Sequence, residues 1–321
     1  MAGTKRLFKS FYRLLSPPVI LSILAVGVAS VWLVFESSKP MTMVYLVTPD
    51  KYGQLSSRAA QVTDEKWTNH DGSQSRGWLL RGIPNAPAVI LLHRYGADRS
   101  HVLNLGVKLN EATNFTVLMP DQRAHGQQPF VEHSTFGGCE ADDVESAITY
   151  LRSLRSPEQV ALVGKDIGIY GLEMGALAAL NAATKNDSIK ALVLDSIPQD
   201  SDALMGHVIG KRFPFASVIT AKFASLGTYP FYYQGCYKRA TSCETARILA
   251  NRRILLLGGI DSPDFQETTS KLGKCFPVNA SVDSKTDLSP SGMGMISASI
   301  EQSEGYDQRV IDYLKQALTM P

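Results

Sequence analysis

The sequence has no strongly charged region and few metal-binding side chains. Its 321 residues carry a net charge of only +2, and beyond the first residues no Lys/Arg-rich block is interleaved with aromatic side chains. This composition gives no indication of a nucleic-acid-binding surface. The six histidines are scattered and the four cysteines lack the close pairs typical of zinc sites, so neither a metal nor a cofactor is predicted. The absence of repeats and low-complexity tracts excludes solenoid architectures.

Apolar residues are abundant enough for one large core. Hydrophobic side chains make up 44% of the chain and charged side chains 19%, and α/β folds of this length are often undivided. We therefore expect one domain over residues 61–321, preceded by a linker over residues 36–60.

The first 35 residues have the pattern of a membrane anchor. A basic segment over residues 1–13 precedes an uncharged, mostly apolar run over residues 14–35. A helix over that run is about 30 Å long, which matches the hydrocarbon core of a bilayer. By the positive-inside rule, the N-terminus is cytoplasmic and the domain lies on the extracytoplasmic side, periplasmic or extracellular. The sequence thus predicts a single-pass transmembrane signal anchor.

A cleaved signal peptide is the alternative interpretation of this segment. Val28, Ala29 and Ser30 resemble a small-residue cleavage site after a short apolar core. The apolar run continues to Phe35, which favours the uncleaved anchor. Both interpretations export the domain.

The cysteines would then lie in an oxidising compartment, where disulfides form. Cys236 and Cys243 are the nearest pair in the sequence. A disulfide between them is one expectation, and free buried thiols are the other.

Apolar runs of strand length alternate with helical patterns along the rest of the chain. This alternation predicts a mostly parallel sheet with helices on both faces. Strands are expected over 67–73, 77–80, 87–92, 115–119, 166–170, 191–194, 253–257 and 277–282. Helices are expected over 99–112, 140–154, 174–184, 264–273 and 305–318. The alternation breaks over residues 198–248, which we interpret as a small cap of helices and loops.

Four short motifs, in order, resemble those of the α/β-hydrolase superfamily, especially its serine esterase and peptidase-like branches. The resemblance covers roughly residues 60–320 and implies the α/β-hydrolase fold. The motifs are His93-Arg94-Tyr95-Gly96, Asp121-Gln122-Arg123-Ala124-His125-Gly126, Gly171-Leu172-Glu173-Met174-Gly175 and Gly258-Gly259-Ile260-Asp261.

Two residues that the family's hydrolysis requires are missing. The family places a nucleophilic serine in a strained turn between a strand and a helix, where this sequence has Glu173. A glutamate has no hydroxyl, so the usual acyl-enzyme route is closed. The triad histidine is expected before the final helix, but the last histidine in the chain is His207. Only Asp261 stands at a position that matches the triad, that of the acid.

The oxyanion hole is built from backbone N–H groups and does not depend on the missing side chains. The resemblance assigns these donors to Met174 and to Arg94 or Tyr95. Arg94 replaces a glycine of the motif. A bulky residue there would distort a glycine-only conformation, and its guanidinium could pair with Glu173.

Three further polar residues are expected to hold loops in place. His93 is a candidate pocket residue, although the resemblance implies that its ring bonds nearby backbone. Asp121 and Arg123 are expected to form a pair that braces the turn after their strand.

Two functions of different classes follow. In the first, the chain is a membrane-anchored protein that is inactive as a serine hydrolase and is retained to bind a small-molecule or protein ligand. In the second, it is an active hydrolase on ester or related acyl substrates that uses Glu173, or a histidine such as His101 or His125, by an unorthodox mechanism. A purely structural role in a membrane assembly is a third possibility.

Overall fold

The described part of the chain divides into two compact units. The computed structural model describes residues 2–41, 45–54, 56, 58–214, 217–233 and 235–319. One unit, which we name the anchor unit, consists of residues 1–37 and 205–235. The other, the sheet unit, consists of residues 38–204 and 236–321.

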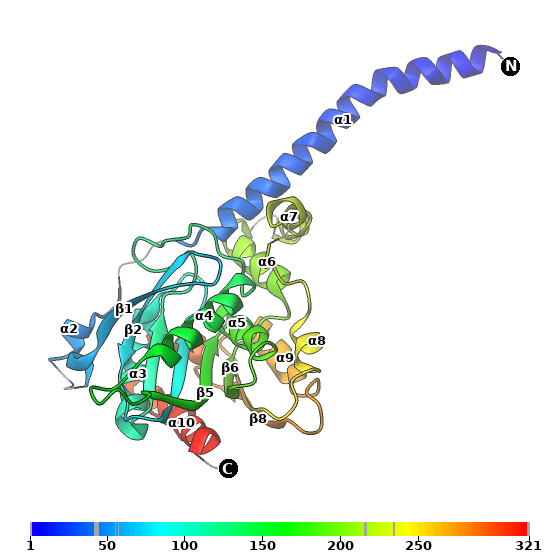
Figure 1. Cartoon of the computed structure of the whole chain (residues 1–321). Coiled ribbons are helices and arrows are strands. Elements are labelled where there is room, and N and C mark those ends of the chain that lie inside the picture. The colour runs from blue at the N-terminus through cyan, green and yellow to red at the C-terminus, as the bar shows by residue number, and fades with distance from the viewer. Residues whose placement is uncertain are drawn as a thin grey trace. The chain divides into compact units, whose positions relative to one another are not determined.

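The sheet unit is built on one eight-stranded sheet with the order β1-β2-β4-β3-β5-β6-β7-β8 (Figure 1). Strands β1 and β2 pair antiparallel, β2 is antiparallel to β4, and every other pairing is parallel. The mostly parallel sheet that the sequence predicts is therefore confirmed. The strands are β1 (Thr63–Thr68), β2 (Gln74–Leu80), β3 (Ala86–Leu92), β4 (Thr116–Pro120), β5 (Val163–Leu172), β6 (Ile189–Asp195), β7 (Arg253–Gly259) and β8 (Ser281–Leu288).

Burial explains why the central strands could be recognised from sequence. Strand β4 is buried at every residue, and β3 and β6 at all but one, because helices cover both faces. Strand β8 lies at the sheet's edge and is polar and largely exposed. The strand expected over residues 277–282 is consequently misplaced, since β8 has no apolar run to mark it.

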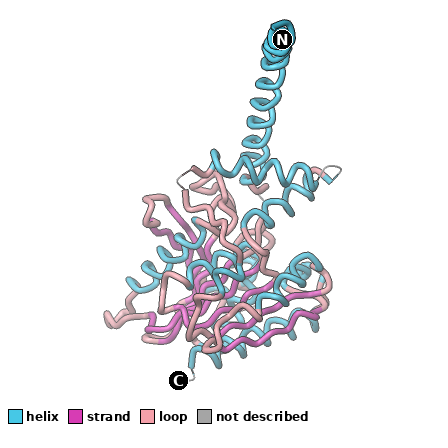
Figure 2. Tube along the Cα trace, turned by 90° about the vertical axis from the view of Figure 1, so that its right-hand side faces the viewer, coloured by secondary structure: helices cyan, strands magenta, loops and turns pink. Residues whose placement is uncertain are grey.

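Helices flank the sheet on both faces, as Figure 2 shows. Helices α3 and α10 contact each other on one face, and α4 and α5 contact each other on the opposite face. The helices of the sheet unit include α2 (Pro49–Tyr52), α3 (Leu103–Thr113), α4 (Cys139–Ser153), α5 (Met174–Ala183), α8 (Ser242–Ala246), α9 (Pro263–Leu272) and α10 (Ile300–Thr319). Short 3-10 turns are η1 (Ala59–Gln61), η2 (Arg99–Val102) and η4 (Gly292–Ser297).

The anchor unit is helical. It contains α1 (Ala2–Ser38), most of α6 (Ser201–Arg212) and α7 (Ser217–Phe231). The part of α1 over Pro17–Ser38 has a mean hydropathy of 2.4 and is long and apolar enough to cross a membrane. Side chains of residues 2–16, which include the basic segment, lie outside the described ones.

Two disulfides join the four cysteines, Cys139 with Cys236 and Cys243 with Cys275. The pairing of Cys236 with Cys243 and the free-thiol alternative are both wrong. The backbone of Cys236 lies directly against Gly138 at the start of α4, which brings its sulfur to Cys139. Cys243 lies in α8, which contacts α9, and Cys275 follows the end of α9. The helix packing, rather than proximity in sequence, decides the partners.

Candidate functional site

Glu173 occupies a sharp turn between strand β5 and helix α5. Its backbone has φ 51° and ψ −104°, a conformation that strains a residue with a side chain. A Cβ atom at Gly171 would overlap the carbonyl of Gly175, and one at Gly175 would lie 2.8 Å from the carbonyl oxygen of His93. Both glycines are therefore required by close backbone contacts, as the motif predicts.

The carboxylate of Glu173 is turned inward. The residue is only 3% exposed, and its Oε2 accepts a hydrogen bond from the Tyr95 N–H at 2.9 Å. The Tyr95 N–H is one of the two donors assigned to the oxyanion hole. The N–H of Met174 belongs to the first residue of α5, where helix amides lack partners within the helix. The carboxylate thus occupies the Tyr95 donor on which an oxyanion would depend.

Arg94 fits its loop without strain. Its φ is not positive, so the arginine replaces the motif's glycine at no cost in backbone conformation. No hydrogen bond or ion pair joins its side chain to any described residue. The possible pair between Arg94 and Glu173 is therefore not formed.

His93 bridges two stretches of backbone. Its ring is fully buried, with Nδ1 bonded to the Arg94 carbonyl at 2.8 Å and Nε2 accepting the Gln122 N–H at 3.0 Å. Burial lowers the pKa of His93 to about 3. A neutral imidazole with both nitrogens engaged holds the loops together and has no free atom for chemistry.

Asp261 is bonded to the loop in which the family carries its histidine. Its two carboxylate oxygens accept the Ser291 N–H at 3.0 Å and the Ser291 hydroxyl at 3.1 Å. Ser291 is fully buried, whereas Asp261 is exposed. The acid thus stabilises the loop around a serine.

Sequence reasoning missed a second buried carboxylate, Asp195, at the end of β6. It accepts hydrogen bonds from the Tyr306 hydroxyl at 2.5 Å, the Gly292 N–H at 2.9 Å and the Ser196 hydroxyl at 2.7 Å. The hydroxyl of Tyr170 lies 2.9 Å from that of Tyr306. Burial raises the pKa of Asp195. A polar residue that ends an apolar strand is the only indication of it in the sequence.

The sharp turn that carries Glu173 is called the elbow below. A cavity of about 210 Å³ lies beside it in the sheet unit. Arg94 and Leu172, the residue before Glu173, both line it, as does His101. The Nε2 atom of His101 is buried without a hydrogen-bond partner among the described residues. The remaining lining residues are mixed: the apolar ones are Leu46, Val47, Val102, Leu105, Met293, Met295 and Ile296, and the polar ones include Ser100, Asn104, Tyr170, Ser303, Tyr306 and Asp307.

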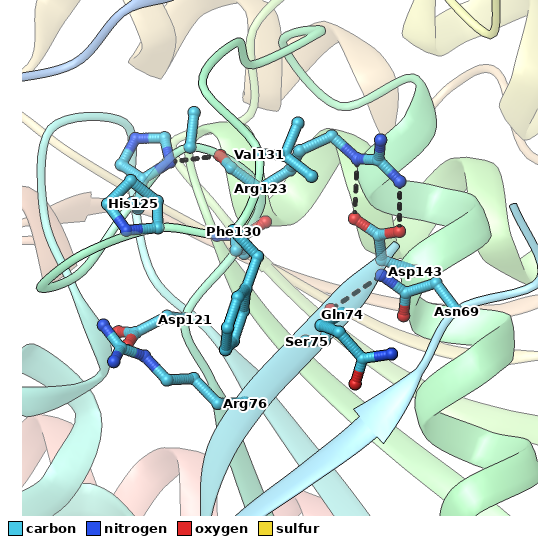
Figure 3. Close-up of a pocket in the computed structure, with 13 residues that line it drawn as sticks. Asn69, Gln74, Ser75, Arg76, Asp121, Arg123, His125, Phe130, Val131 and Asp143 are labelled. Atoms are coloured by element: carbon cyan, nitrogen blue, oxygen red, sulfur yellow. Dashed lines mark hydrogen bonds and ion pairs between the residues drawn. The ribbon is translucent and has the colours of Figure 1, made fainter. Parts of the chain in front are cut away.

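The turn after β4 is braced by different partners from those expected. Arg123 binds Asp143 with two hydrogen bonds, of 2.9 and 2.6 Å, and its carbonyl lies 2.7 Å from Nδ1 of His125 (Figure 3). Asp121 instead pairs with Arg76 at 3.3 Å. The expected pair of Asp121 with Arg123 is wrong because the two side chains diverge around a cavity of only about 20 Å³, which is room for about one water molecule.

Within the described residues, no group of three or more His, Cys, Asp or Glu side chains is arranged to hold a metal ion.

Sequence and structure comparisons agree on the fold. A sequence model described as the alpha/beta hydrolase fold matches residues 87–228. The thiohydrolase aneE of Aspergillus aculeatus is 23% identical over 124 residues, which span 38% of this chain and 37% of that protein. The esterase Pf2001 of Pyrococcus furiosus superposes with a TM-score of 0.61 at 21% identity, over 87% of this chain and 98% of the esterase. The α/β hydrolase GrgF of a Penicillium species gives a TM-score of 0.59 at 14% identity, over 81% and 99% of the two chains.

Proposed function

We propose that this chain, which belongs to the α/β-hydrolase superfamily, is a membrane-anchored protein that binds a ligand and lacks serine-hydrolase activity. The observation that carries the proposal is the hydrogen bond from the Tyr95 N–H to the Glu173 carboxylate. A serine hydrolase needs that donor free for the oxyanion and a hydroxyl at the elbow. Here one residue removes the hydroxyl and occupies the donor.

The loss of proton transfer supports the same proposal. Ser291 is the partner of Asp261, and no histidine follows His207 in the sequence. The acid therefore has no imidazole to orient. A thiohydrolase or an esterase, as the similar proteins are named, would need a nucleophile and a proton acceptor from elsewhere in this chain.

The anchor and the disulfides support a location outside the cytoplasm. Helix α1 carries the apolar span, and the basic segment before it favours a cytoplasmic N-terminus. The bonds between Cys139 and Cys236 and between Cys243 and Cys275 are typical of an oxidising compartment.

The cavity beside the elbow suggests the ligand's chemistry. A cavity of about 150 Å³ is known to hold benzene, so one of about 210 Å³ has room for about eight non-hydrogen atoms by the same scale. Arg94 offers a cation without an ionic partner, and His101 offers an unsatisfied ring nitrogen. Seven apolar side chains line part of the rest of the wall, and Asp307 and several neutral polar residues line the remainder. A small carboxylate with a short alkyl chain would pair with Arg94, bond to His101 and place its chain against the apolar part of the wall, away from Asp307.

The test of inactivity compares the full-length wild type with Glu173→Ala, Glu173→Gln and Glu173→Ser in detergent, using aryl esters and aryl thioesters. We expect no turnover by the wild type above that of the alanine variant. Turnover by the wild type that both Glu173→Ala and Glu173→Gln abolish would establish Glu173 as catalytic and overturn the proposal.

The test of binding measures the thermal unfolding midpoint with hexanoate and with hexanol, which shares the alkyl chain but has no charge. Hexanoate is expected to raise the midpoint because a ligand that binds only the folded state stabilises it. Hexanol is expected to act more weakly. Equal effects of the two would show that no anionic site is present.

A further inference from the structure

Helix α7 exposes a mostly apolar face. Val218, Ile219 and Leu226 are each at least 60% exposed. Ile219 and Leu226 are seven residues apart and share one side of the helix. Large exposed apolar faces of this kind mark contacts with another protein or with a membrane.

The opposite face of α7 packs on α1, within the anchor unit. A Cβ atom on Gly227 would overlap the backbone of Ser30, so the two helix backbones are in direct contact. Small residues permit such close approach between helices in membranes. The ring of Phe231, at the end of α7, lies 6.5 Å from that of Phe35. Helix α7 is thereby fixed along residues 30–35 of α1.

This contact sets the depth of α7 relative to a bilayer. If Pro17–Ser38 spans the hydrocarbon core, Ser30 lies eight residues inside the outer end and Phe35 three, or about 12 Å and about 4.5 Å at 1.5 Å per residue. Helices that lie in the membrane interface bury their apolar face by about 5–10 Å. The contacts of α7 with α1 therefore cover a range of depths that includes the depth of an interfacial helix.

Charge in this segment is also of one sign. Residues 205–235 contain no aspartate or glutamate but include Lys211, Arg212 and Lys222. A nearby acid, Glu36, pairs with Arg212 at 3.7 Å. Lys222 is three residues after Ile219 and four before Leu226, so it lies on the same side of α7. Its long stem can lie along apolar surface while the ammonium group reaches the headgroups, where cations are attracted by anionic lipids.

We infer that α7 is a second membrane contact, which lies in the outer leaflet beside the anchor with Ile219 and Leu226 in the acyl region. This inference rests on the membrane anchor of the proposed function and is independent of whether the elbow is inactive. It makes the anchor unit a two-helix membrane-binding element rather than a single tether.

The experiment measures lipid exposure in the full-length protein, reconstituted in vesicles of phosphatidylcholine and phosphatidylglycerol. All four native cysteines are in disulfides, so a cysteine introduced by Ile219→Cys or Leu226→Cys is the only thiol open to a nitroxide label. Electron paramagnetic resonance then compares the label's accessibility to oxygen, which enters lipid, with its accessibility to a water-soluble nickel complex. Labels at 219 and 226 are expected to lose nickel accessibility and gain oxygen accessibility.

Two matched labels make the outcomes distinguishable. Val160→Cys, on the exposed surface of the sheet unit, is expected to remain open to nickel, and Leu24→Cys, in the middle of the span, is expected to be shielded. Nickel access at 219 and 226 with shielding at 24 would overturn the inference and leave the anchor intact. Nickel access at 24 as well would overturn both.

A second measurement uses the unmodified chain. In vesicles that contain a photoactivatable phosphatidylcholine, peptides from residues 217–231 are expected to carry the lipid adduct. Labelling confined to peptides of α1 would overturn the inference even if a cysteine variant failed to fold.

Discussion

Two regions of the candidate site differ in how they are held: the elbow at Glu173 and the loop over residues 289–299. The elbow is held by close backbone contacts of Gly171 and Gly175, with the strained Glu173 between them. The loop over residues 289–299 is held by Asp261, whose hydrogen-bond partner there is the buried Ser291. The turn has the close glycine contacts that its motif predicts, whereas the loop is held by contacts that no short motif marks.

This difference separates what the fold needs from what the chemistry needs. The elbow glycines are required because β3, β5 and α5 meet there, whatever residue stands at position 173. The loop over residues 289–299 is held by hydrogen bonds to Asp195 and Asp261. We therefore expect substitutions of the elbow glycines to unfold the protein. Substitutions that affect the loop over residues 289–299 are expected to lower the free energy of unfolding moderately.

The largest effect is expected from Gly175→Ala. The added Cβ would lie 2.7 Å from the Cβ of Leu92 and 2.8 Å from the carbonyl oxygen of His93. It would also overlap the carbonyl oxygen of Leu92. Because these carbonyls belong to a central strand and the loop after it, they cannot move aside, and we expect a loss of about 3 kcal/mol or more in the free energy of unfolding. Urea unfolding of the full-length protein, followed by the fluorescence of the buried Trp67 and Trp78, measures it.

Gly305→Ala is the matched control. Gly305 lies within α10, and a Cβ there has no atom within 4 Å. Alanine favours a helix over glycine, so this variant is expected to be more stable by about 0.5–1 kcal/mol. Equal losses from both glycines would show that the elbow contacts are not special.

A smaller effect is expected from Asp195→Asn, because Asp195 holds the loop over residues 289–299 through Gly292. The NH₂ group of asparagine replaces a carboxylate oxygen that accepts hydrogen bonds from Tyr306, Gly292 or Ser196. A buried N–H donor of the asparagine then faces a second donor, with no acceptor between them. We expect a loss of about 1–3 kcal/mol in the free energy of unfolding.

The pH dependence of that loss follows from the pKa of Asp195. Burial raises the pKa in the folded state above the ordinary value of 3.8, so the folded protein holds the proton more tightly than the unfolded chain does. The wild type is favoured most below pH 3.8 and loses this contribution as pH rises through the folded pKa. Its advantage over Asp195→Asn should therefore narrow with rising pH. If the difference in the free energy of unfolding widens with pH instead, the hydrogen-bond donors around Asp195 lower its pKa more than burial raises it.

The sequence predicted features that a short stretch of chain encodes. The apolar runs of β3, β4 and β6 and the glycines around Glu173 could be located because their residue types are needed locally. The bond of Cys139 to Cys236, 97 residues apart, could not, because it depends on how α4 packs. The roles of Asp195 and Ser291 were missed for the same reason, since both arise from contacts between strand ends and a distant loop.

The smallest effect on stability is expected from Arg94→Ala, although Arg94 lies next to Tyr95, which contacts Glu173 at the elbow. Its guanidinium has no ionic partner among the described residues and its backbone has no positive φ, so we expect a change within about 0.5 kcal/mol. If Arg94 instead serves the cavity it lines, the stabilisation by hexanoate should disappear while that by hexanol persists. A hexanoate effect that survives the substitution would place the anion elsewhere. Loss of binding without loss of stability would show that the elbow keeps its backbone for a ligand that Arg94 recognises.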